Sequence, residues 1–385
     1  MRAHQNMQRL LQSRREKGNF RSLNLVEEGK VDFCSNDYLG FSRGGKIEKL
    51  ISNQSEKNLS KESGSGGSRL LAGNSVLVET LEKRIAEFHS GESALLFNSG
   101  YDANLGFYSC VPQKNDLIIY DEYVHASMID GIRSSLADSL KFRHNQLEDL
   151  LVKFSRKSKD YHSVFVAVES VYSMDGDFAP LRELAELCRS REWNLCVDEA
   201  HAGGVFGKQG RGLLNELNLE SVCFARLYAY GKAFGSHGAS IVGSSLLREF
   251  LINFSRPFIY STALPPHSLK RIDLAYDLMT FEDERKKLLE NIRFANKVFQ
   301  EFPFYQIGRS PIQIIRIPGN ENVAFVAQAL QQKGFDVRPI KSPTVPEGKE
   351  CLRICLHSFN TKSEIENLKI ELMKVLSMKN NQRIN

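Results

Sequence analysis

The chain has 385 residues, of which 42% are hydrophobic and 25% are charged, and its 51 basic and 46 acidic residues give a net charge of +5. This balance is typical of a globular protein with one large domain and a smaller one. No stripe of lysine and arginine interleaves with aromatic residues, and no apolar run approaches the roughly 18 residues of a membrane span, so we expect neither nucleic acid nor a membrane as a partner.

The N-terminal region and the cysteines bear on cellular location. Residues 1–20 lack the apolar core of a signal peptide and predict an amphipathic, basic helix that packs on the body of the protein. The seven cysteines are odd in number and lie among apolar neighbours, which favours reduced thiols in a cytoplasmic protein over a disulfide framework. The sequence has no CxxC pair and no HExxH motif, so no metal site is predicted.

The next segments lead into an α/β pattern. Residues 31–42 predict a short strand that ends in a turn, residues 61–75 form a glycine- and serine-rich loop, and residues 76–91 predict an amphipathic helix. Short, nearly continuous apolar runs then predict strands at 94–97, 117–120, 163–169, 194–198, 222–229 and 239–243. Because such runs alternate with helical patterns such as 180–191, where Pro180 suits the first helical position, we expect an α/β fold with a mostly parallel sheet flanked by helices.

The pattern changes after residue 264. The segment LPPHS interrupts the chain, and residues 269–302 predict one long amphipathic helix. From residue 303 the order is strand, helix, strand, strand and helix, which predicts a small α+β domain. We therefore divide the chain into an N-terminal arm (1–40), a large domain (41–268), and a linking helix with a small C-terminal domain (269–385).

Polar residues follow five of the predicted strands, and ligands bind beyond the carboxyl ends of strands in open parallel sheets. The candidates for one shared site are Ser99, Gly100, Tyr101, His125, Ser173, Asp198, His201 and Lys232. Each has an ordinary alternative when taken alone: Lys232 as a surface lysine in a glycine-rich loop, the histidines as satisfied polar residues, and Asp198 as a helix cap. Their convergence on one sheet edge favours a shared site.

This set matches the chemistry of pyridoxal phosphate (PLP). Lys232 would carry the aldehyde of the cofactor as an imine, and Asp198 would keep the pyridine nitrogen protonated, which makes the ring an electron sink. His201 would hydrogen-bond the phenolic oxygen, and His125 would lie flat on the ring and handle protons near neutral pH. The phosphate would be held at a helix start by Ser99, Gly100 and Tyr101.

The chain resembles the α-oxoamine synthases, which are PLP enzymes of fold type I that condense an amino acid with an acyl thioester, usually with loss of carbon dioxide. The resemblance covers essentially the whole length. It depends on segments that include SNDYLG (35–40), GSGGSRLLAG (64–73), NSGYDAN (98–104), DEYVHAS (121–127), DEAHAGGVFGKQGRG (198–212), GKAFGSHG (231–238) and YSTALPP (260–266). Within the family, PTVPEG (343–348) and LRICL (352–356) are most like the biotin-pathway member, which joins L-alanine to a pimeloyl thioester.

The resemblance implies further roles at the cofactor and the substrate. Lys232 would be the Schiff-base lysine and also the base that removes the α-proton, and Ser173 would join the histidine at the phenolic oxygen. Arg353 would bind the carboxylate of the amino acid, and Asn36 and Arg21 would line the substrate site.

The resemblance also implies a homodimer. Ser261 and Thr262 match residues that reach the phosphate of the neighbouring subunit, so the active sites would be shared. Two positions depart from the family pattern: Ala229 stands where a threonine usually donates to the phosphate, and Gly203 stands where a hydroxyl residue is common. The missing charge-assisted hydrogen bond would cost roughly 1.5–3 kcal/mol of cofactor binding unless a water or Thr262 of the partner subunit replaces it.

Other functions stay open at this point. Within the family, the substrates could be glycine with a short acyl thioester or serine with a long one, and the carrier could be coenzyme A or a carrier protein. A nucleotide-dependent enzyme has weak support, because Ala233 follows Lys232 and no Walker motif surrounds the lysine. A non-catalytic binding protein on the same fold is a third class, but it would be expected to lose Lys232, Asp198 or His125, and all three are present.

Overall fold

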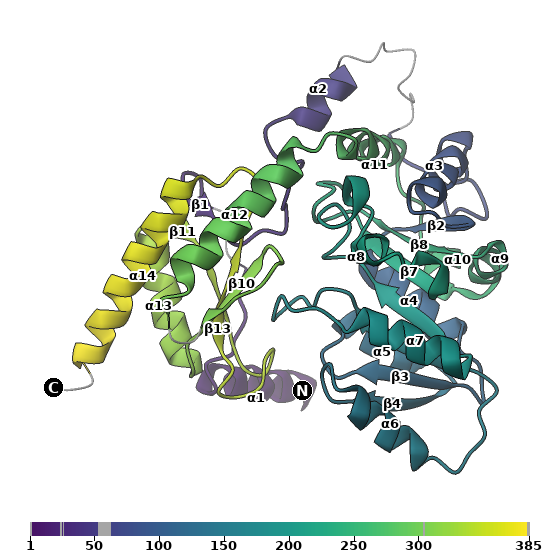
Figure 1. Ribbon diagram of the computed structural model, residues 1–385, viewed down its shortest axis with the longest axis horizontal. Coiled ribbons are helices and arrows are strands. Elements are labelled where there is room, and N and C mark those ends of the chain that lie inside the picture. Colours follow the sequence, from purple (N-terminus) through teal and green to yellow (C-terminus); the bar gives the residue numbers. More distant parts are fainter. Residues whose placement is uncertain (1, 24, 26, 53–62, 303–304, 383–385) are drawn as a thin grey trace. The chain divides into compact units, whose positions relative to one another are not determined.

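A computed structural model describes residues 2–23, 25, 27–52, 63–302 and 305–382 (Figure 1). The chain forms two compact units. The larger unit comprises Asn36–Ser173 and Asp177–Arg285, and the smaller unit comprises Met1–Ser35, Met174–Gly176 and Lys286–Asn385. The N-terminal and C-terminal segments therefore fold together. The domain bounds expected from the sequence (1–40, 41–268 and 269–385) differ from this grouping and stay a prediction.

A seven-stranded sheet forms the centre of the larger unit. Its strands, in spatial order, are β2 (Ser93–Phe97), β8 (Ala239–Gly243), β7 (Cys223–Ala229), β6 (Asn194–Asp198), β5 (Val164–Glu169), β3 (Leu117–Asp121) and β4 (Asp138–Phe142). β8 is antiparallel to both of its neighbours, whereas the other adjacent pairs are parallel. The predicted mostly parallel sheet is confirmed. The sequence pattern does not reveal β4, because this edge strand is largely exposed and has no apolar run.

Helices flank this sheet (Figure 1). They are α3 (Val76–Phe88), α4 (Gly100–Cys110), α5 (Ala126–Ser134), α6 (Leu147–Ser155), α7 (Leu181–Arg191), α8 (Leu213–Leu217), α9 (Ser245–Phe254), α10 (Arg256–Ile259) and α11 (Pro266–Met279). A further helix of this unit, α2 (Lys46–Ser52), packs against α11. Pro180 is the N-cap of α7 and not its first helical residue, so that prediction is wrong by one position. Because α4 and α5 start directly after strand ends, their N-termini lie at the edge of the sheet where the polar candidates gather.

The prediction of one long helix over residues 269–302 is wrong. The segment forms α11 and then α12 (Asp283–Phe299), with a break at residues 280–282. The hydroxyl of Thr280 donates to the carbonyl of Asp277 at 2.6 Å, and the Arg285 guanidinium donates to the carbonyl of Met279 at 2.8 Å. These side chains satisfy carbonyl groups that a helix end leaves without partners, which stabilises the break.

The smaller unit is an α+β structure, as predicted. An antiparallel four-stranded sheet has the order β12 (Arg338–Ile340), β13 (Cys351–Cys355), β10 (Ile312–Arg316) and β9 (Tyr305–Gln306). A two-stranded parallel sheet joins β1 (Val31–Asp32) to β11 (Phe335–Asp336). Residues 335–340, which are the second of the three strands predicted after residue 303, are therefore divided between two sheets. The helices of this unit are α13 (Asn320–Gln332), α14 (Lys362–Gln382), α1 (Arg2–Glu16) and most of α12.

The predicted packing of the N-terminal helix on the body is wrong. No residue of α1 is buried. Its apolar side chains are Met7, Leu10 and Leu11, which are 57%, 57% and 45% exposed, together with the single methyl group of Ala3. This apolar set is too small to provide the wide stripe that holds a helix against a core.

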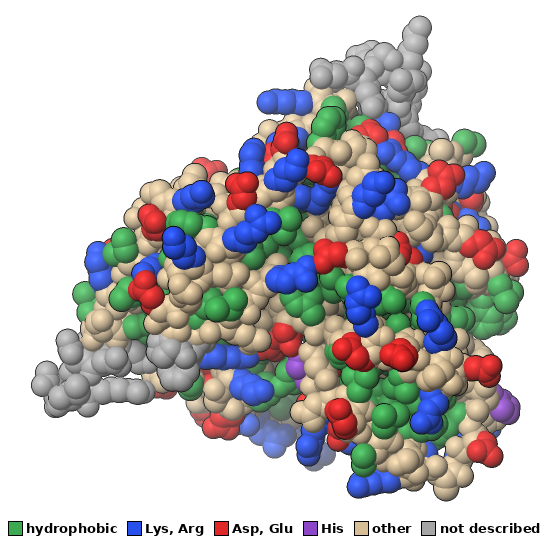
Figure 2. Space-filling view, viewed as in Figure 1, with side chains coloured by type: hydrophobic (Ala, Val, Ile, Leu, Met, Phe, Trp, Pro, Cys, Tyr) green, Lys and Arg blue, Asp and Glu red, His purple; other side chains and the backbone are tan. Residues whose placement is uncertain are grey.

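The surface carries both signs of charge. On the face shown in Figure 2, lysine and arginine side chains are interspersed with aspartate and glutamate. Among the helices of the described residues, none combines the length and the apolar character that a membrane crossing needs. All seven cysteines are free thiols, and within the described ranges no group of three or more histidine, cysteine or acidic side chains is placed to hold a metal ion.

Candidate active site

A cavity of about 280 Å³ lies at the carboxyl ends of the central strands of the larger unit. This volume is close to the lower end of the range for small-molecule sites. The cavity brings together the predicted residues Asn36, Ser99, Gly100, Tyr101, His125, Asp198, His201 and Lys232. They come from loops that are far apart in the sequence, as the argument from strand ends predicts.

The N-terminus of α4 forms one wall of the cavity. Ser99 is the N-cap of this helix: its hydroxyl accepts from the backbone N–H of Asp102 at 3.0 Å and donates to the Asp102 carboxylate at 2.8 Å. A Cβ added at Gly100 would lie 3.5 Å from the Cβ of Ala229, so the first helical residue faces that side chain. The remaining N–H groups of a helix start can hold a phosphate.

Asp198 ends β6 and is 6% exposed. Its Oδ1 accepts from the backbone N–H of Ala200 at 2.8 Å, and its Oδ2 accepts from Nδ2 of Asn104 at 2.9 Å. Both carboxylate oxygens therefore receive a hydrogen bond from a fixed donor, which favours a charged aspartate at the wall of the cavity. A carboxylate held in this way can pair with a protonated pyridine nitrogen.

His201 is almost fully buried, and its Nδ1 lies 2.7 Å from the hydroxyl of Tyr38. That hydroxyl also donates to Oδ1 of Asn36 at 3.2 Å. Tyr38 itself is fully buried, so it links the SNDYLG segment to the histidine that follows β6. The sequence analysis does not assign a role to Tyr38, although the tyrosine lies inside a motif that the family resemblance uses.

Lys232 lies in the tight connection between β7 and β8. The backbone N–H of Tyr230 donates to the carbonyl of Gly238 at 2.9 Å, and the N–H of Gly235 donates to the carbonyl of Lys232 at 2.8 Å. Gly235 has a φ of +58°, and a Cβ at this position would lie 2.3 Å from the backbone nitrogen of Ser42. Only glycine fits there, so the glycines around the lysine fix the loop that presents it.

His125 is the N-cap of α5, and its partly buried ring lies at the wall of the cavity. Partial burial lowers the pKa of His125 below its ordinary value; the charge of Asp198 acts in the opposite direction, and the charge of Lys232 adds to the lowering. The ring is thus mainly neutral near pH 7.

Four polar residues to which sequence reasoning assigns no role also line the cavity: Asn104, Ser127, Glu169 and His237. Glu169 is the last residue of β5, lies beside Asp198 in the sheet, and is 3% exposed. Burial raises the pKa of Glu169 well above its ordinary value, and the charge of Asp198 raises it further. The sequence contains a signal that could have identified Glu169, because this residue ends a predicted strand just as Asp198 does.

Five predicted residues lie elsewhere. Ser173 is buried in the loop after β5 but is not part of the cavity lining. Arg21 and Arg353 belong to the smaller unit, where Nη1 of Arg353 donates to the sulfur of Cys355 at 3.0 Å. Ser261 and Thr262 line a separate cavity of about 20 Å³.

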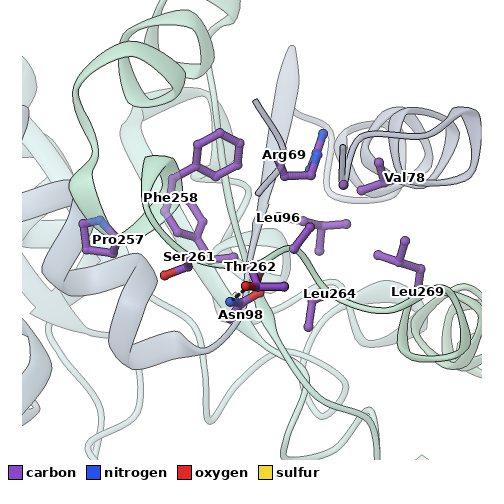
Figure 3. Close-up of a pocket in the computed structure, with 13 residues that line it drawn as sticks. Arg69, Val78, Leu96, Asn98, Pro257, Phe258, Ser261, Thr262, Leu264 and Leu269 are labelled. Atoms are coloured by element: carbon purple, nitrogen blue, oxygen red, sulfur yellow. Dashed lines mark hydrogen bonds between the residues drawn. The ribbon is translucent and has the colours of Figure 1, made fainter. Parts of the chain in front are cut away.

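Figure 3 shows this small cavity, in which the Asn98 amide donates to the backbone carbonyl of Thr262 at 2.8 Å. The backbone of Thr262 also forms an antiparallel bridge with Ser68 of the glycine-rich loop. The segment expected to reach a neighbouring subunit is therefore tied to the residue directly before Ser99.

The donor set of the larger cavity fits PLP. It offers an amine, a carboxylate held by two donors, the imidazole rings of His125 and His201, and the N–H groups of a helix start. These groups complement an aldehyde, a pyridine nitrogen, a planar ring with a phenolic oxygen, and a phosphate.

Comparison with known proteins gives a consistent result. The model of the family described as aminotransferase class I and II matches residues 28–369. An 8-amino-7-oxononanoate synthase from Emericella nidulans is 39% identical over 382 residues, covering 93% of this chain and 92% of the relative. The structure of 8-amino-7-oxononanoate synthase from Francisella tularensis has a TM-score of 0.77 and 31% identity, with 92% and 99% of the two chains covered. A serine palmitoyltransferase variant from S. paucimobilis, solved with a PLP–myriocin aldimine, has a TM-score of 0.86 and 26% identity, with 96% of each chain covered.

Proposed function

This chain belongs to the aminotransferase class I and II family and is a PLP-dependent enzyme of fold type I and of the acyltransferase type, and from that premise we propose that it condenses L-alanine with a pimeloyl thioester. The products are 8-amino-7-oxononanoate, carbon dioxide and a free thiol, and the step belongs to biotin biosynthesis in the cytoplasm. The observation that carries the proposal is the cavity that gathers Lys232, Asp198 and His125, in a chain whose relatives are named 8-amino-7-oxononanoate synthases.

In this proposal each cavity residue has its own role at the cofactor. Lys232 Nζ would hold the cofactor covalently, and after the substrate amino group has displaced it, the free amine would take the proton from Cα of the amino acid. Asp198 would accept a hydrogen bond from the pyridine N–H and keep that nitrogen protonated, and His125 would lie on the face of the ring. When bound, PLP supplies an electron sink for the electron pair that the Cα–H bond leaves behind.

The remaining predicted residues complete the site. The start of α4, with Ser99, Gly100 and Tyr101, holds the phosphate. His201 and Ser173 hold the phenolic oxygen.

The amino-acid substrate is bound by residues outside the phosphate and ring contacts. Arg353 binds its carboxylate, and Asn36 and Arg21 line the place where it enters. A guanidinium suits this role, because its planar fork matches a carboxylate.

A second candidate is the condensation of serine with a long acyl thioester. The specific observation in its favour is the TM-score of 0.86 to serine palmitoyltransferase, which exceeds the value of 0.77 to 8-amino-7-oxononanoate synthase. The sequence identities have the opposite order, 26% against 31%. We favour alanine because side chains, and not backbone shape, decide the substrate.

Product analysis separates these candidates. The purified enzyme is incubated with PLP and each pairing of alanine, glycine or serine with pimeloyl- or palmitoyl-coenzyme A, and the products are identified by mass spectrometry. We expect 8-amino-7-oxononanoate from alanine and pimeloyl-coenzyme A. A product only from serine and palmitoyl-coenzyme A would replace alanine as the substrate, and a protein in which borohydride fixes no cofactor to Lys232 would overturn the enzymatic reading.

We also propose that the enzyme is a homodimer with shared sites, in which Ser261 and Thr262 of one protomer reach the phosphate bound by the other. A Lys232→Ala chain and a Ser261→Ala/Thr262→Ala chain, each of low activity, are mixed after mild dissociation. Mixed dimers contain one site with native residues from both protomers, so we expect activity to return to about a quarter of the native level. Mixtures no more active than their components would contradict shared sites.

A further inference from the structure

A line of hydrogen bonds connects His125 to Asp198 along the wall of the cavity. Nδ1 of His125 lies 2.7 Å from the hydroxyl of Ser127, the amide nitrogen of Asn104 donates to that hydroxyl at 3.0 Å, and the same nitrogen donates to Asp198 at 2.9 Å. Ser127 is fully buried and Asn104 is 4% exposed. Asn104 comes from α4 and Ser127 from α5, so the line crosses three elements of one compact unit.

The donors and acceptors in this line can be assigned. The carboxylate of Asp198 only accepts, so the nitrogen of the Asn104 amide faces it, and the second hydrogen of that nitrogen points to the Ser127 oxygen. The backbone N–H of Ser127, which can only donate, points to Nδ1 of His125 at 3.3 Å. Nδ1 must therefore carry a lone pair, and the Ser127 hydroxyl, whose oxygen already accepts from Asn104, is free to give its own hydrogen to the same lone pair.

This arrangement determines where the histidine holds its proton. With Nδ1 acting as the acceptor of two hydrogen bonds, the ring proton lies on Nε2. Protonation of Nδ1 would place a third hydrogen against two donors and break the cap at the start of α5. The neutral ring is therefore favoured over the imidazolium.

The two charged groups that act on His125 have opposite effects. Lys232 favours the neutral ring, while Asp198 favours the charged one. The backbone N–H of His125 faces Glu169, a buried carboxyl whose Oε1 accepts from no group in the described residues. Burial is the largest influence on His125 and lowers its pKa, so the net direction agrees with the hydrogen-bond geometry although Asp198 opposes it.

We propose that Ser127 and Asn104 are positioning residues that hold His125 as a neutral ring with its proton on Nε2 and link it to the carboxylate of Asp198. The histidine then acts as a hydrogen-bond donor through Nε2 and does not serve as a cation. This changes the expectation that His125 handles protons near neutral pH. The catalytic meaning of the inference rests on the proposed function, but the tautomer does not.

The first test reads the tautomer directly. Histidine labelled with nitrogen-15 is incorporated into the full chain, the His125 signals are assigned with a His125→Asn variant, and both ring nitrogens are followed from pH 5 to 9 with and without PLP. We expect the Nε2–H tautomer throughout the neutral range. A native protein with the proton on Nδ1 would overturn the inference without any use of a variant.

The second test removes the hydroxyl. In Ser127→Ala we expect the His125 titration to move to higher pH and both tautomers to appear, and in Ser127→Thr we expect the native pattern to return. Ser134→Ala provides the control, because Ser134 is an exposed serine of the same helix whose hydroxyl donates to a backbone carbonyl at 2.9 Å. A Ser127→Ala protein that is folded by circular dichroism and titrates like the control would refute the role of Ser127.

The third test concerns catalysis. If the product assay identifies the amino acid, we expect Ser127→Ala and Asn104→Ala to lower kcat roughly tenfold with little change in the KM for that amino acid. Ser127→Ala removes a hydrogen bond to the His125 ring, and Asn104→Ala removes the bonds that orient Ser127 and Asp198. A rise in KM alone would mean that the residues shape the substrate site and do not position His125. Failure of the alanine assay with the native tautomer confirmed would refute only the proposed function.

Discussion

Replacement of His144 by glutamine tests the electrostatics of the larger unit. Nδ1 of His144 lies 2.9 Å from Oδ1 of Asp121, and its Nε2 lies 2.7 Å from Oδ2 of Asp177. The Asp121 side chain is fully buried and that of His144 is 16% exposed. Burial alone lowers the pKa of His144, but hydrogen bonds and charge from the two aspartates outweigh it and raise the pKa to about 9.

The size of the effect follows from linkage. A histidine with a pKa of 6.5 in the unfolded chain and about 9 in the folded protein stabilises the fold by about 3 kcal/mol when it is protonated in both states. Because the folded pKa is the higher one, this stabilisation is fully present below pH 6.5 and is lost as the pH rises through 9. Glutamine can keep a hydrogen bond but carries no charge, so the variant lacks this dependence.

The assay is urea unfolding of the native protein and of His144→Gln at pH 6 and pH 10, at one protein concentration. We expect the native protein to exceed the variant in unfolding free energy by about 3 kcal/mol more at pH 6 than at pH 10. His162→Gln, which replaces an exposed histidine, is the control and should follow the native protein. If the unfolding free energies of the native protein and the variant differ by the same amount at pH 6 and at pH 10, a charged His144 does not bridge the two aspartates.

Three further predictions concern other residues of the larger unit. Burial raises the pKa of Glu199 to about 7 from 4.5, so ionisation of this carboxyl lowers the stability of the fold as the pH rises from 4.5 to 7. In urea unfolding, the unfolding free energy of Glu199→Gln relative to that of the native protein should therefore rise by about 3 kcal/mol between pH 4.5 and pH 8. A relative value that does not vary with pH would contradict this. Gly212→Ala should lower stability by more than about 2 kcal/mol, because Gly212 has a φ of +118° and the added Cβ would lie 1.7 Å from Oε2 of Glu199. A thermal midpoint within a degree of the native one would show the reasoning to be wrong. Ala229→Thr should tighten PLP binding about tenfold, because the threonine hydroxyl restores a hydrogen-bond donor beside Gly100. Fluorescence titration measures the binding, and unchanged or weaker binding would argue against a phosphate at this position.

Much of the site could be read from the order of strands and polar residues. A strand buried on both faces must be apolar along its whole length, as β5 and β6 nearly are, so its end is visible where the apolar run stops. Parallel strands bring their carboxyl ends to one edge, and that rule alone places Asp198 near Lys232. The family resemblance adds Asn36, which also lines the cavity.

The sequence by itself therefore determined the class of fold, the strands of the central sheet apart from its exposed edge, and most of the residues that line the cavity from the strand ends, with Glu169 missed and Ser173 not part of that lining. Tertiary structure alone decided that the helical pattern after residue 264 breaks at 280–282, that α1 stays exposed, and that Asn104 and Ser127 join His125 to Asp198. The physical reason is the separation along the chain of the residues that interact. Burial along one strand leaves its pattern in neighbouring residues, whereas a hydrogen bond between α4, α5 and β6 depends on the approach of side chains that are up to 94 residues apart in the chain.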